Sequence, residues 1–512
     1  MASDRSDDAA IHQPLLGQLD ADDEPVSPSR LEQQGTFTRN LGAIEAFGIV
    51  ISIVIGSGVF TSPGSIDTNV PSPGIALVIW LVGGILAWTG ASTFAELGTA
   101  IPGEGGVQPY LRHIYGDVYG FLSAWTWIVA IMPATLAILS IVFVESAYSA
   151  AGVMDGAGNL SHKFLSILVL LVMSVANSIS TKASTQLNSY FVVLKFTSIG
   201  AVVIAAIAVV GLQLSNPDRD IGGRDWFTKP WFAYRKSSNP DGTETDWSGL
   251  SQWEIFGHYS AALYGALWAY SGWDKAIYVS AELSEPARQL PLAINTSIPT
   301  AIICFLAANA AYYILLPWDV VSTTDSVAVT AITALLGRGF GIVAAVLICL
   351  VVAGSLLGNS FVASRMTVAA ANRGWIPRIF TVVGTVGRKS DHDGNTDSEN
   401  TSDAPINAII LSAVLAAIYI LFGSFRALLT LNGLGEYSFF FLTVLGAVIL
   451  RYREPHLHRP YKPFILNHFL FLAVSGFVVA RGAAFAPFQA LIVVAIWIVG
   501  LVFYKARKRR VE

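Results

Sequence analysis

Long, almost uncharged apolar stretches recur along most of the chain. A helix needs about 20 mostly apolar residues to cross the hydrocarbon core of a bilayer. Twelve such runs can be counted, and the eighth extends to about Ala371. They begin near Leu41, Ile75, Val118, Phe164, Leu187, Glu254, Ala293, Ala331, Pro405, Arg426, Phe464 and Pro487. This pattern predicts an all-α integral membrane protein with about twelve transmembrane helices.

Composition supports the same class of protein. The 512 residues are 53% hydrophobic and only 13% charged, whereas a soluble protein has about 25% charged residues. The formal net charge of −4 is too small to indicate a nucleic-acid partner. Cys304 and Cys349 both lie inside apolar runs, and no Cys/His metal spacing is present. We therefore expect no disulfide framework, metal or cofactor, and membrane lipid as the surroundings.

Charged segments predict the orientation. The basic stretches "SRMTVAAANRGWIPRIF…GRKS", "RYREPHLHRPYK" and "KARKRR" follow the eighth, tenth and twelfth predicted spans. An even number of crossings separates them, so all three should lie in the cytoplasm. Both termini are then cytoplasmic, with residues 1–40 forming a disordered acidic tail and residues 505–512 a basic tail. The long segment 213–253 would lie on the opposite side.

The first apolar run is interrupted at its centre. In "GIVISIVIGSGVF", Gly56, Ser57 and Gly58 stand where glycine costs a helix about 1 kcal/mol relative to alanine. Non-helical backbone at membrane depth persists only when it is buried in protein or lines a cavity. The amides that start the second half would attract a carboxylate, and the last carbonyls of the first half suit an ammonium group. The alternative is a face of small residues for helix packing.

A second interruption favours the cavity. Ser271 and Gly272 break the sixth run near its middle. The first and sixth runs begin the two halves of a five-plus-five arrangement. Interrupted helices at corresponding positions indicate a transport site between inverted repeats. No direct sequence repeat between the halves is visible, so this symmetry is inferred from position.

Around these residues the chain resembles the L-type amino acid transporter family of the amino acid–polyamine–organocation superfamily. "IGSGVFTSPG" (55–64) and "AYSGWD" with "AELSEPARQLPLAI" are similar to the first- and sixth-helix motifs of that family. "IPGEGGVQPYL" (101–111) and "LRYREPHLHRP" (450–460) resemble the segments after its second and tenth helices. The chain is also similar to fungal methionine permeases. The tails and residues 213–253 fall outside the likeness.

The resemblance implies a fold and an activity. It implies a transporter domain of residues 41–504, with a LeuT-like inverted-repeat core of about residues 41–450 whose first and sixth helices are discontinuous. Two extra helices would occupy about residues 464–504. The implied activity is sodium-independent exchange or uptake of neutral, large or methionine-like L-amino acids, in the plasma membrane.

Site residues carried over from the resemblance cluster at the two breaks. Backbone amides of Ser57 and Gly58 would hold the substrate carboxylate, and the carbonyls of Val54, Trp268 and Ser271 its ammonium. Trp268 matches an aromatic gate over the substrate. The substrate-binding residues predicted in this way are Val54, Ile55, Gly56, Ser57, Gly58, Trp268, Ser271, Gly272, Asp274 and Glu436. Lys195 matches a fifth-helix lysine that replaces the sodium ion of related transporters, and its ammonium should face carbonyls at or just before Gly56.

Ionisable residues inside spans are functional hypotheses by default. Asp274 and Glu436 fall by resemblance near the distal part of the substrate pocket. Three interpretations stay open: a buried ion pair, a cation-selecting pocket, or a proton-coupling carboxylate. Lys275 could neutralise one of them, although neighbours on a helix do not face each other. Glu96, near a span end, is explained by solvation at the interface.

Several alternatives remain open at this point. A cationic or broad-range amino acid transporter with proton coupling, or a nutrient receptor without transport, would share these features. An enzyme is not expected, because the eight histidines are scattered and no nucleophile–base spacing is present. The loop of residues 146–163 lacks the cysteine that links relatives to a heavy subunit, so no disulfide-linked partner is expected. Asn159 begins a glycosylation sequon there.

Overall fold

The structure is a computed structural model. It describes residues 41–511, apart from residues 57, 102, 104, 152–158, 180, 217–220, 239–242, 279, 281–282, 325–326, 383–403 and 424. The predicted acidic tail and the predicted substrate residue Ser57 therefore lie outside the described residues.

Within the described residues, nine helical segments are long and apolar enough to cross a membrane. The protein is therefore a multi-span integral membrane protein. The segments are α4 (Pro73–Ala100), α6 (Asp117–Thr126) continued by η1 (Trp127–Ile131) and α7 (Met132–Ala151), α8 (Leu160–Ile179), α9 (Thr181–Ser215), α12 (Pro286–Leu315), α15 (Arg338–Asn372), α17 (Phe425–Arg453), α18 (Ile465–Phe485) and α19 (Pro487–Val511). The basic residues predicted as a C-terminal tail continue α19 as helix up to Val511.

Three predicted spans are missing from these nine for identifiable reasons. The first is split into α2 (Ala43–Val54) and α3 (Gly58–Asp67), and the sixth into α11 (Gln252–Ala269) and the 3₁₀ segment η2 (Trp273–Tyr278). The ninth, α16 (Ile406–Phe422), has only 17 residues. The structure thus contains both predicted breaks, and a length criterion overlooks helices that are interrupted.

The predicted start of the eighth span was wrong. A separate short helix, α14 (Val327–Leu336), occupies the region around Ala331, and α15 begins only at Arg338. Gly337 separates them with a φ of +88°, a left-handed conformation that glycine adopts without strain. The apolar pattern runs through this corner, so periodicity alone did not reveal it.

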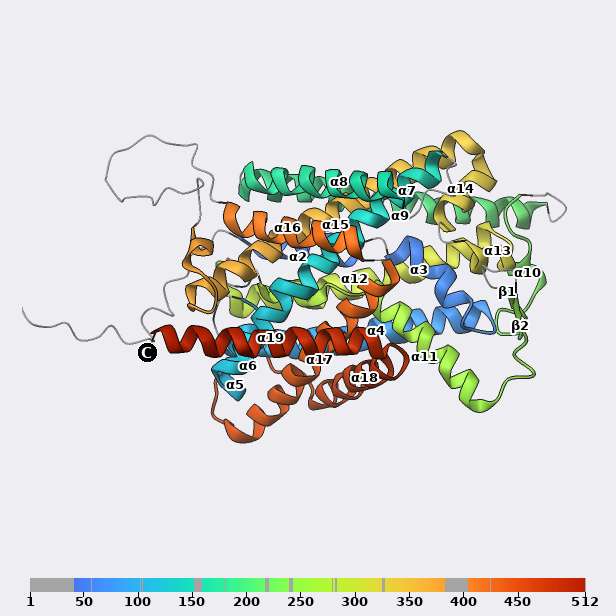
Figure 1. Ribbon diagram of the computed structural model, residues 1–512. Coiled ribbons are helices and arrows are strands. Elements are labelled where there is room, and N and C mark those ends of the chain that lie inside the picture. Colours follow the sequence, from blue (N-terminus) through green and yellow to red (C-terminus); the bar gives the residue numbers. More distant parts are fainter. Residues whose placement is uncertain are drawn as a thin grey trace, which may run out of the picture. The chain divides into compact units, whose positions relative to one another are not determined.

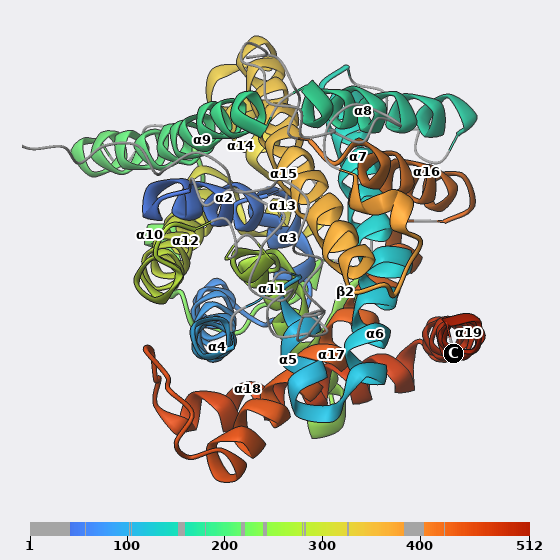
Figure 2. The ribbon, with the colours of Figure 1, turned by 90° about the vertical axis from the view of Figure 1, so that its left-hand side faces the viewer.

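The helices that carry the breaks lie inside the bundle. Figure 2 looks along it and shows α3 and α11 near the centre, with α4, α12, α15 and α17 around them. Helices α8, α18 and α19 lie at the edge. Their apolar side chains are largely exposed, as lipid-facing residues are. The backbone breaks are therefore surrounded by protein.

Short elements cap the two ends of the bundle. At the right in Figure 1, α10 (Asp225–Thr228), the two-residue antiparallel strands β1 (Ser237–Ser238) and β2 (Glu244–Thr245), and α13 (Trp318–Thr323) lie together. These strands and an isolated β-bridge between Leu41 and Leu283 depart from the predicted all-α fold. At the left are α5 (Val107–Tyr115), α6 and the end of α19.

The three basic segments meet at the α5 end. Asp117 accepts hydrogen bonds from Trp375 Nε1 (3.2 Å) and from Tyr504 Oη (2.6 Å). His113 Nε2 lies 3.0 Å from Glu454 Oε2, and this hydrogen bond lowers the pKa of Glu454. The segments after α15, after α17 and at the end of α19 therefore share one end of the bundle, as the charge pattern predicts.

Candidate functional site

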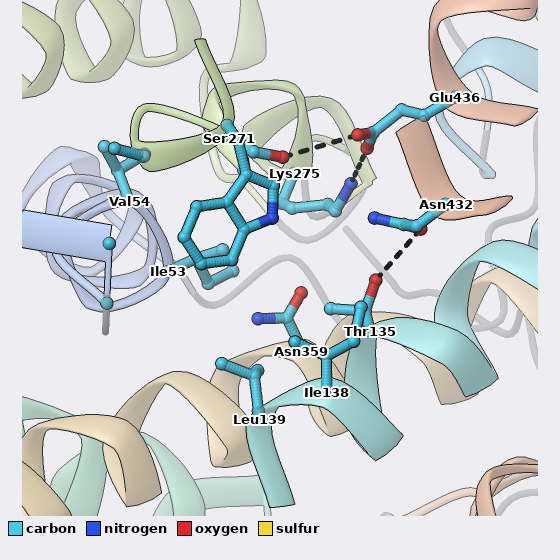
Figure 3. Close-up of a pocket in the computed structure, with 15 residues that line it drawn as sticks. Ile53, Val54, Thr135, Ile138, Leu139, Ser271, Lys275, Asn359, Asn432 and Glu436 are labelled. Carbon is cyan, nitrogen blue, oxygen red and sulfur yellow. Dashed lines mark hydrogen bonds and ion pairs between the residues drawn. The ribbon is translucent and has the colours of Figure 1, made fainter. Parts of the chain in front are cut away.

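A cavity lies where the two helix breaks meet. The cavity has a volume of about 70 Å³, several times what one water molecule needs. Its lining residues are Ile53, Val54, Gly56, Gly58, Thr135, Ile138, Leu139, Trp268, Ala269, Ser271, Gly272, Lys275, Asn359, Asn432 and Glu436. Figure 3 shows Ser271, Lys275 and Glu436 on one wall and Thr135, Ile138, Leu139 and Asn359 on the opposite one.

Most of the predicted substrate residues are brought together here. Val54, Gly56, Gly58, Trp268, Ser271, Gly272 and Glu436 all line the cavity. Ile55 and Asp274 are buried but are not among the lining residues. Trp268 is half-buried, and its ring stands edge-on to Phe425 with centroids 6.5 Å apart.

At the first break, a lysine side chain replaces the helical hydrogen-bond partner of the Ser52 carbonyl. In a continuous helix the amide of Gly56 would donate to the carbonyl of Ser52; instead it donates to Val54 O at 2.9 Å. Lys195 Nζ donates to the freed Ser52 carbonyl and to Ser355 Oγ (2.9 Å), and Ser355 Oγ also donates to Ser52 O (2.9 Å). The side chain of Lys195 is fully buried. Its ammonium thus lies at the freed Ser52 carbonyl, four residues before Gly56.

Glycines let the two broken helices approach closely. A Cβ on Gly58 would lie 2.7 Å from Ala269 Cα, and a Cβ on Gly272 would lie 2.4 Å from Ile53 Cγ2. Gly272 also has a φ of +104°. The cavity and packing interpretations of Gly-Ser-Gly are therefore compatible, because Gly58 both lines the cavity and packs on α11.

Asp274, Lys275 and Glu436 form a buried ionic triad. Lys275 Nζ lies 2.7 Å from Asp274 Oδ2 and 2.8 Å from Glu436 Oε1. Ser271 Oγ donates to Glu436 Oε2 at 3.3 Å. The argument that sequence neighbours cannot pair was wrong here. The segment is a short 3₁₀ helix after a break, and the long lysine side chain folds back onto Asp274.

Glu96 is not solvated at an interface, so that expectation was wrong. Its side chain is buried and lies against three basic groups: Arg451 Nη2 (2.5 Å), Arg459 Nε (3.1 Å) and His468 Nε2 (3.1 Å). These partners come from α17, the segment after it, and α18. Glu96 therefore links α4 to the C-terminal helices through ion pairs and is not solvated by water.

Sequence reasoning missed one wall of the cavity. Thr135, Ile138 and Leu139 come from α7, Asn359 from α15 and Asn432 from α17. Asn432 could have been found, because it lies four residues before Glu436 and so on the same helix face. The α7 residues carry no comparable signal in an apolar run. Asn432 Oδ1 accepts from Thr135 Oγ1 at 3.3 Å across the cavity.

A bundle of long apolar helices with an internal cavity at two helix breaks defines a membrane transport protein. The chain belongs to the amino acid permease family, which matches residues 41–504. It is an amino acid transporter of the amino acid–polyamine–organocation superfamily, not an enzyme. The match runs through residues 213–253, which the motif resemblance had left out.

Named relatives are similar along almost the whole chain. The human b(0,+)-type amino acid transporter 1 is 29% identical over 484 residues, covering 94% of this chain and 91% of the relative. The human cystine/glutamate transporter is 28% identical over 466 residues, covering 91% and 84%. The mouse large neutral amino acids transporter small subunit 2 is 26% identical over 466 residues, covering 91% and 80%. The predicted relationship to L-type transporters is confirmed.

Proposed function

We propose that the protein carries neutral L-amino acids, large or methionine-like, across a membrane without sodium, by exchange or uptake. The observation that carries this proposal is the cavity between the two helix breaks, with Lys195 fixed on the freed Ser52 carbonyl. A relative named for large neutral amino acids is consistent with it.

The cavity offers groups for both ends of an amino acid. The helix α3 begins at Gly58, so its first amides and the positive end of its dipole face the cavity and suit a carboxylate. Val54 O accepts one local hydrogen bond, from Gly56 N, whereas Trp268 O accepts from both Ser271 N and Tyr270 N. A carbonyl has two lone pairs, so Val54 O can still accept from an ammonium.

Charge balance around the breaks supports neutral substrates. Asp274 and Glu436 are two carboxylates, and Lys275 and Lys195 are two ammonium groups, all buried. Their formal charges cancel. A zwitterionic amino acid with an uncharged side chain adds no net charge. A substrate with a charged side chain would leave an unbalanced charge in a low-dielectric site.

Lys195 supports sodium independence. A fixed ammonium at the Ser52 carbonyl supplies the positive charge that a sodium ion would bring to the same backbone, and it repels a second cation. The test is uptake of radiolabelled leucine into proteoliposomes, with sodium replaced by choline, with trans-loaded substrate and with unlabelled competitors. Strict sodium dependence would contradict the assignment, and equal competition by all amino acids would contradict neutral selectivity.

For the architecture we propose twelve membrane crossings. The nine long segments, α16 and the two broken helices together make twelve. The breaks in the first and sixth spans support a five-plus-five inverted-repeat, LeuT-like core of about residues 41–450, followed by α18 and α19. The remaining boundaries, residues 1–40 and 505–512 as tails, are part of the same proposal.

For the orientation we propose cytoplasmic termini and a plasma-membrane location. The convergence of the three basic segments at the α5 end supports placing that end in the cytoplasm. Cys304 and Cys349 lie within α12 and α15, which supports function without a disulfide-linked heavy subunit. Co-purification under non-reducing conditions would test this last point.

A second candidate is a cationic or broad-range transporter with proton coupling. Glu436 favours it, because it lines the cavity and shares a single lysine with Asp274. A nutrient receptor is the third, and substrate binding without flux in the proteoliposome assay would favour it. The triad variants described in the Discussion separate the first two candidates.

A further inference from the structure

An ion pair with a buried carboxylate ties the segment between α9 and α11 to the far end of α3. Arg235 Nη2 lies 2.5 Å from Asp67 Oδ2 and 2.7 Å from Asp67 Oδ1. The carboxylate of Asp67 is 0% exposed and also accepts a hydrogen bond from Tyr313 Oη. Asp67 is the last residue of α3, nine residues from Gly58 at the cavity.

The same segment is anchored on α12 and α13. Gly223 N donates to Ile314 O (3.0 Å), and Asp225 Oδ2 accepts from Trp318 N (3.0 Å). Arg235 Nη1 donates to Trp318 O at 2.8 Å. The guanidinium therefore bridges the end of α3 and the start of α13, and it is only 17% exposed.

Two further contacts hold the turn after α3. Ser237 Oγ donates to Val70 O (2.9 Å) and accepts from Trp247 Nε1 (2.9 Å). His258 Nδ1, on α11, lies 2.9 Å from Asn69 Oδ1. The connection therefore joins the outer ends of both half-helices that meet at the cavity.

One continuous stretch of chain thus holds both halves of the first broken helix. Lys195, on α9, binds the Ser52 carbonyl of α2. Arg235, in the connection that follows α9, binds Asp67 of α3. The cation is fully buried in Lys195 and 17% exposed in Arg235, and between the two contacts lies the break that lines the cavity. Because the helix is interrupted between Val54 and Gly58, the relative position of α2 and α3 depends on such outside contacts.

We propose that Arg235 is a positioning residue for transport. It acts through Asp67 to fix α3, and so sets where the amides at Gly58 meet the substrate. The connection between α9 and α11 is then a working part of the transporter, not a passive insertion. The inference uses the proposed function for its transport readout, and a second readout is independent of it.

The test compares Arg235→Gln with Lys236→Gln in the full-length protein. Lys236 is the next residue, 61% exposed, and pairs with the exposed Glu244 at 3.5 Å. We expect Arg235→Gln to raise the KM for leucine uptake about tenfold and to speed hydrogen–deuterium exchange of residues 58–67. Lys236→Gln should change neither. Arg235→Lys keeps a cation and should recover most of the wild-type KM.

The double variant Asp67→Asn/Arg235→Gln removes both charges and guards against misfolding from a lone buried carboxylate. We expect its KM to match that of Arg235→Gln, because the single and the double variant lose the same contact, the ion pair between Arg235 and Asp67. Wild-type KM and exchange in Arg235→Gln, or a lower melting temperature with unchanged KM, would overturn the proposal. Faster exchange in Arg235→Gln, with no amino acid flux even in the wild type, would uphold the positioning role and contradict the proposed function.

Discussion

Lys195 donates a hydrogen bond to the backbone carbonyl of Ser52, the carbonyl that an unbroken helix would have paired with the amide of Gly56. An unpaired carbonyl at this depth would cost several kcal/mol. The lysine therefore makes the break tolerable. In turn, the carbonyl and Ser355 Oγ are the hydrogen-bond partners of the buried ammonium.

Removing this ammonium should severely reduce transport. Lys195→Ala leaves the Ser52 carbonyl with Ser355 as its remaining partner and releases α2, so we expect at least a tenfold loss of uptake. A matched control is Lys163→Ala, since Lys163 Nζ also donates to a backbone carbonyl, that of Leu421 (2.7 Å), but away from the cavity. Equal losses in both variants would argue against a special role for Lys195.

Trp268 should be required for closure over the substrate. It lines the cavity at the end of α11, and Trp268→Ala should lower uptake at least tenfold, which corresponds to about 1.4 kcal/mol. Expression and elution volume should be normal. Trp253 lies on the same helix, but its side chain is 75% exposed. The Trp253→Ala variant should therefore transport normally. Normal uptake by Trp268→Ala would remove this residue from the site.

Gly58 is expected to tolerate no side chain. Even Gly58→Ala places a Cβ 2.7 Å from Ala269 Cα, so α3 and α11 must separate and the cavity must change shape. We expect loss of uptake together with a lower melting temperature. Gly48→Ala, in the first half of the same broken helix, meets nothing within 4 Å and should be neutral or stabilising. Normal transport by both variants would show that close approach at Gly58 is unimportant.

A larger residue at this position cannot separate the two interpretations of the break. Gly58→Val would clash with α11 whether the break forms a binding site or a packing face, so a loss of transport would be uninformative. Substrate protection against thermal unfolding is the better measurement. A binding site predicts that leucine stabilises the wild type but not a folded Gly58→Ala variant.

The ionic triad makes distinct predictions for its members. Lys275→Met leaves two buried carboxylates without a cation, and breaking a buried pair costs about 3–5 kcal/mol, so we expect poor folding. Glu436→Gln keeps the Asp274–Lys275 pair and should fold. If Glu436 is structural, neutral uptake persists with unchanged competition by arginine and lysine.

Two other outcomes for Glu436→Gln would change the assignment. Selective loss of arginine and lysine competition would identify a cation-selecting pocket. Loss of the pH dependence of uptake would identify a proton-coupling carboxylate. Asp274→Asn is the matched comparison, because Asp274 is buried beside Lys275 but does not line the cavity.

The sequence by itself determined the class of protein, the breaks and most residues around them. Apolar runs long enough to cross a bilayer leave no soluble alternative, and Gly-Ser-Gly and Ser-Gly are local signals of chain interruption. Because an even number of predicted membrane crossings separates the basic segments, the sequence placed them on the same side of the membrane. Lys195 was assigned by resemblance, and the structure places its ammonium on a freed carbonyl of the first helix.

Only the tertiary structure decided what lies opposite these residues. Thr135 and Asn359 reach the cavity because α7 and α15 pack across from the breaks, and no local pattern reports that packing. Lys275 pairs with Asp274 and Glu436 because η2 is a 3₁₀ helix rather than an α-helix and Glu436 of α17 lies beside it. Arg235 meets Asp67 across 168 positions of sequence. Such contacts depend on how distant elements pack together, whereas the membrane spans and the helix breaks are determined by short local stretches of sequence.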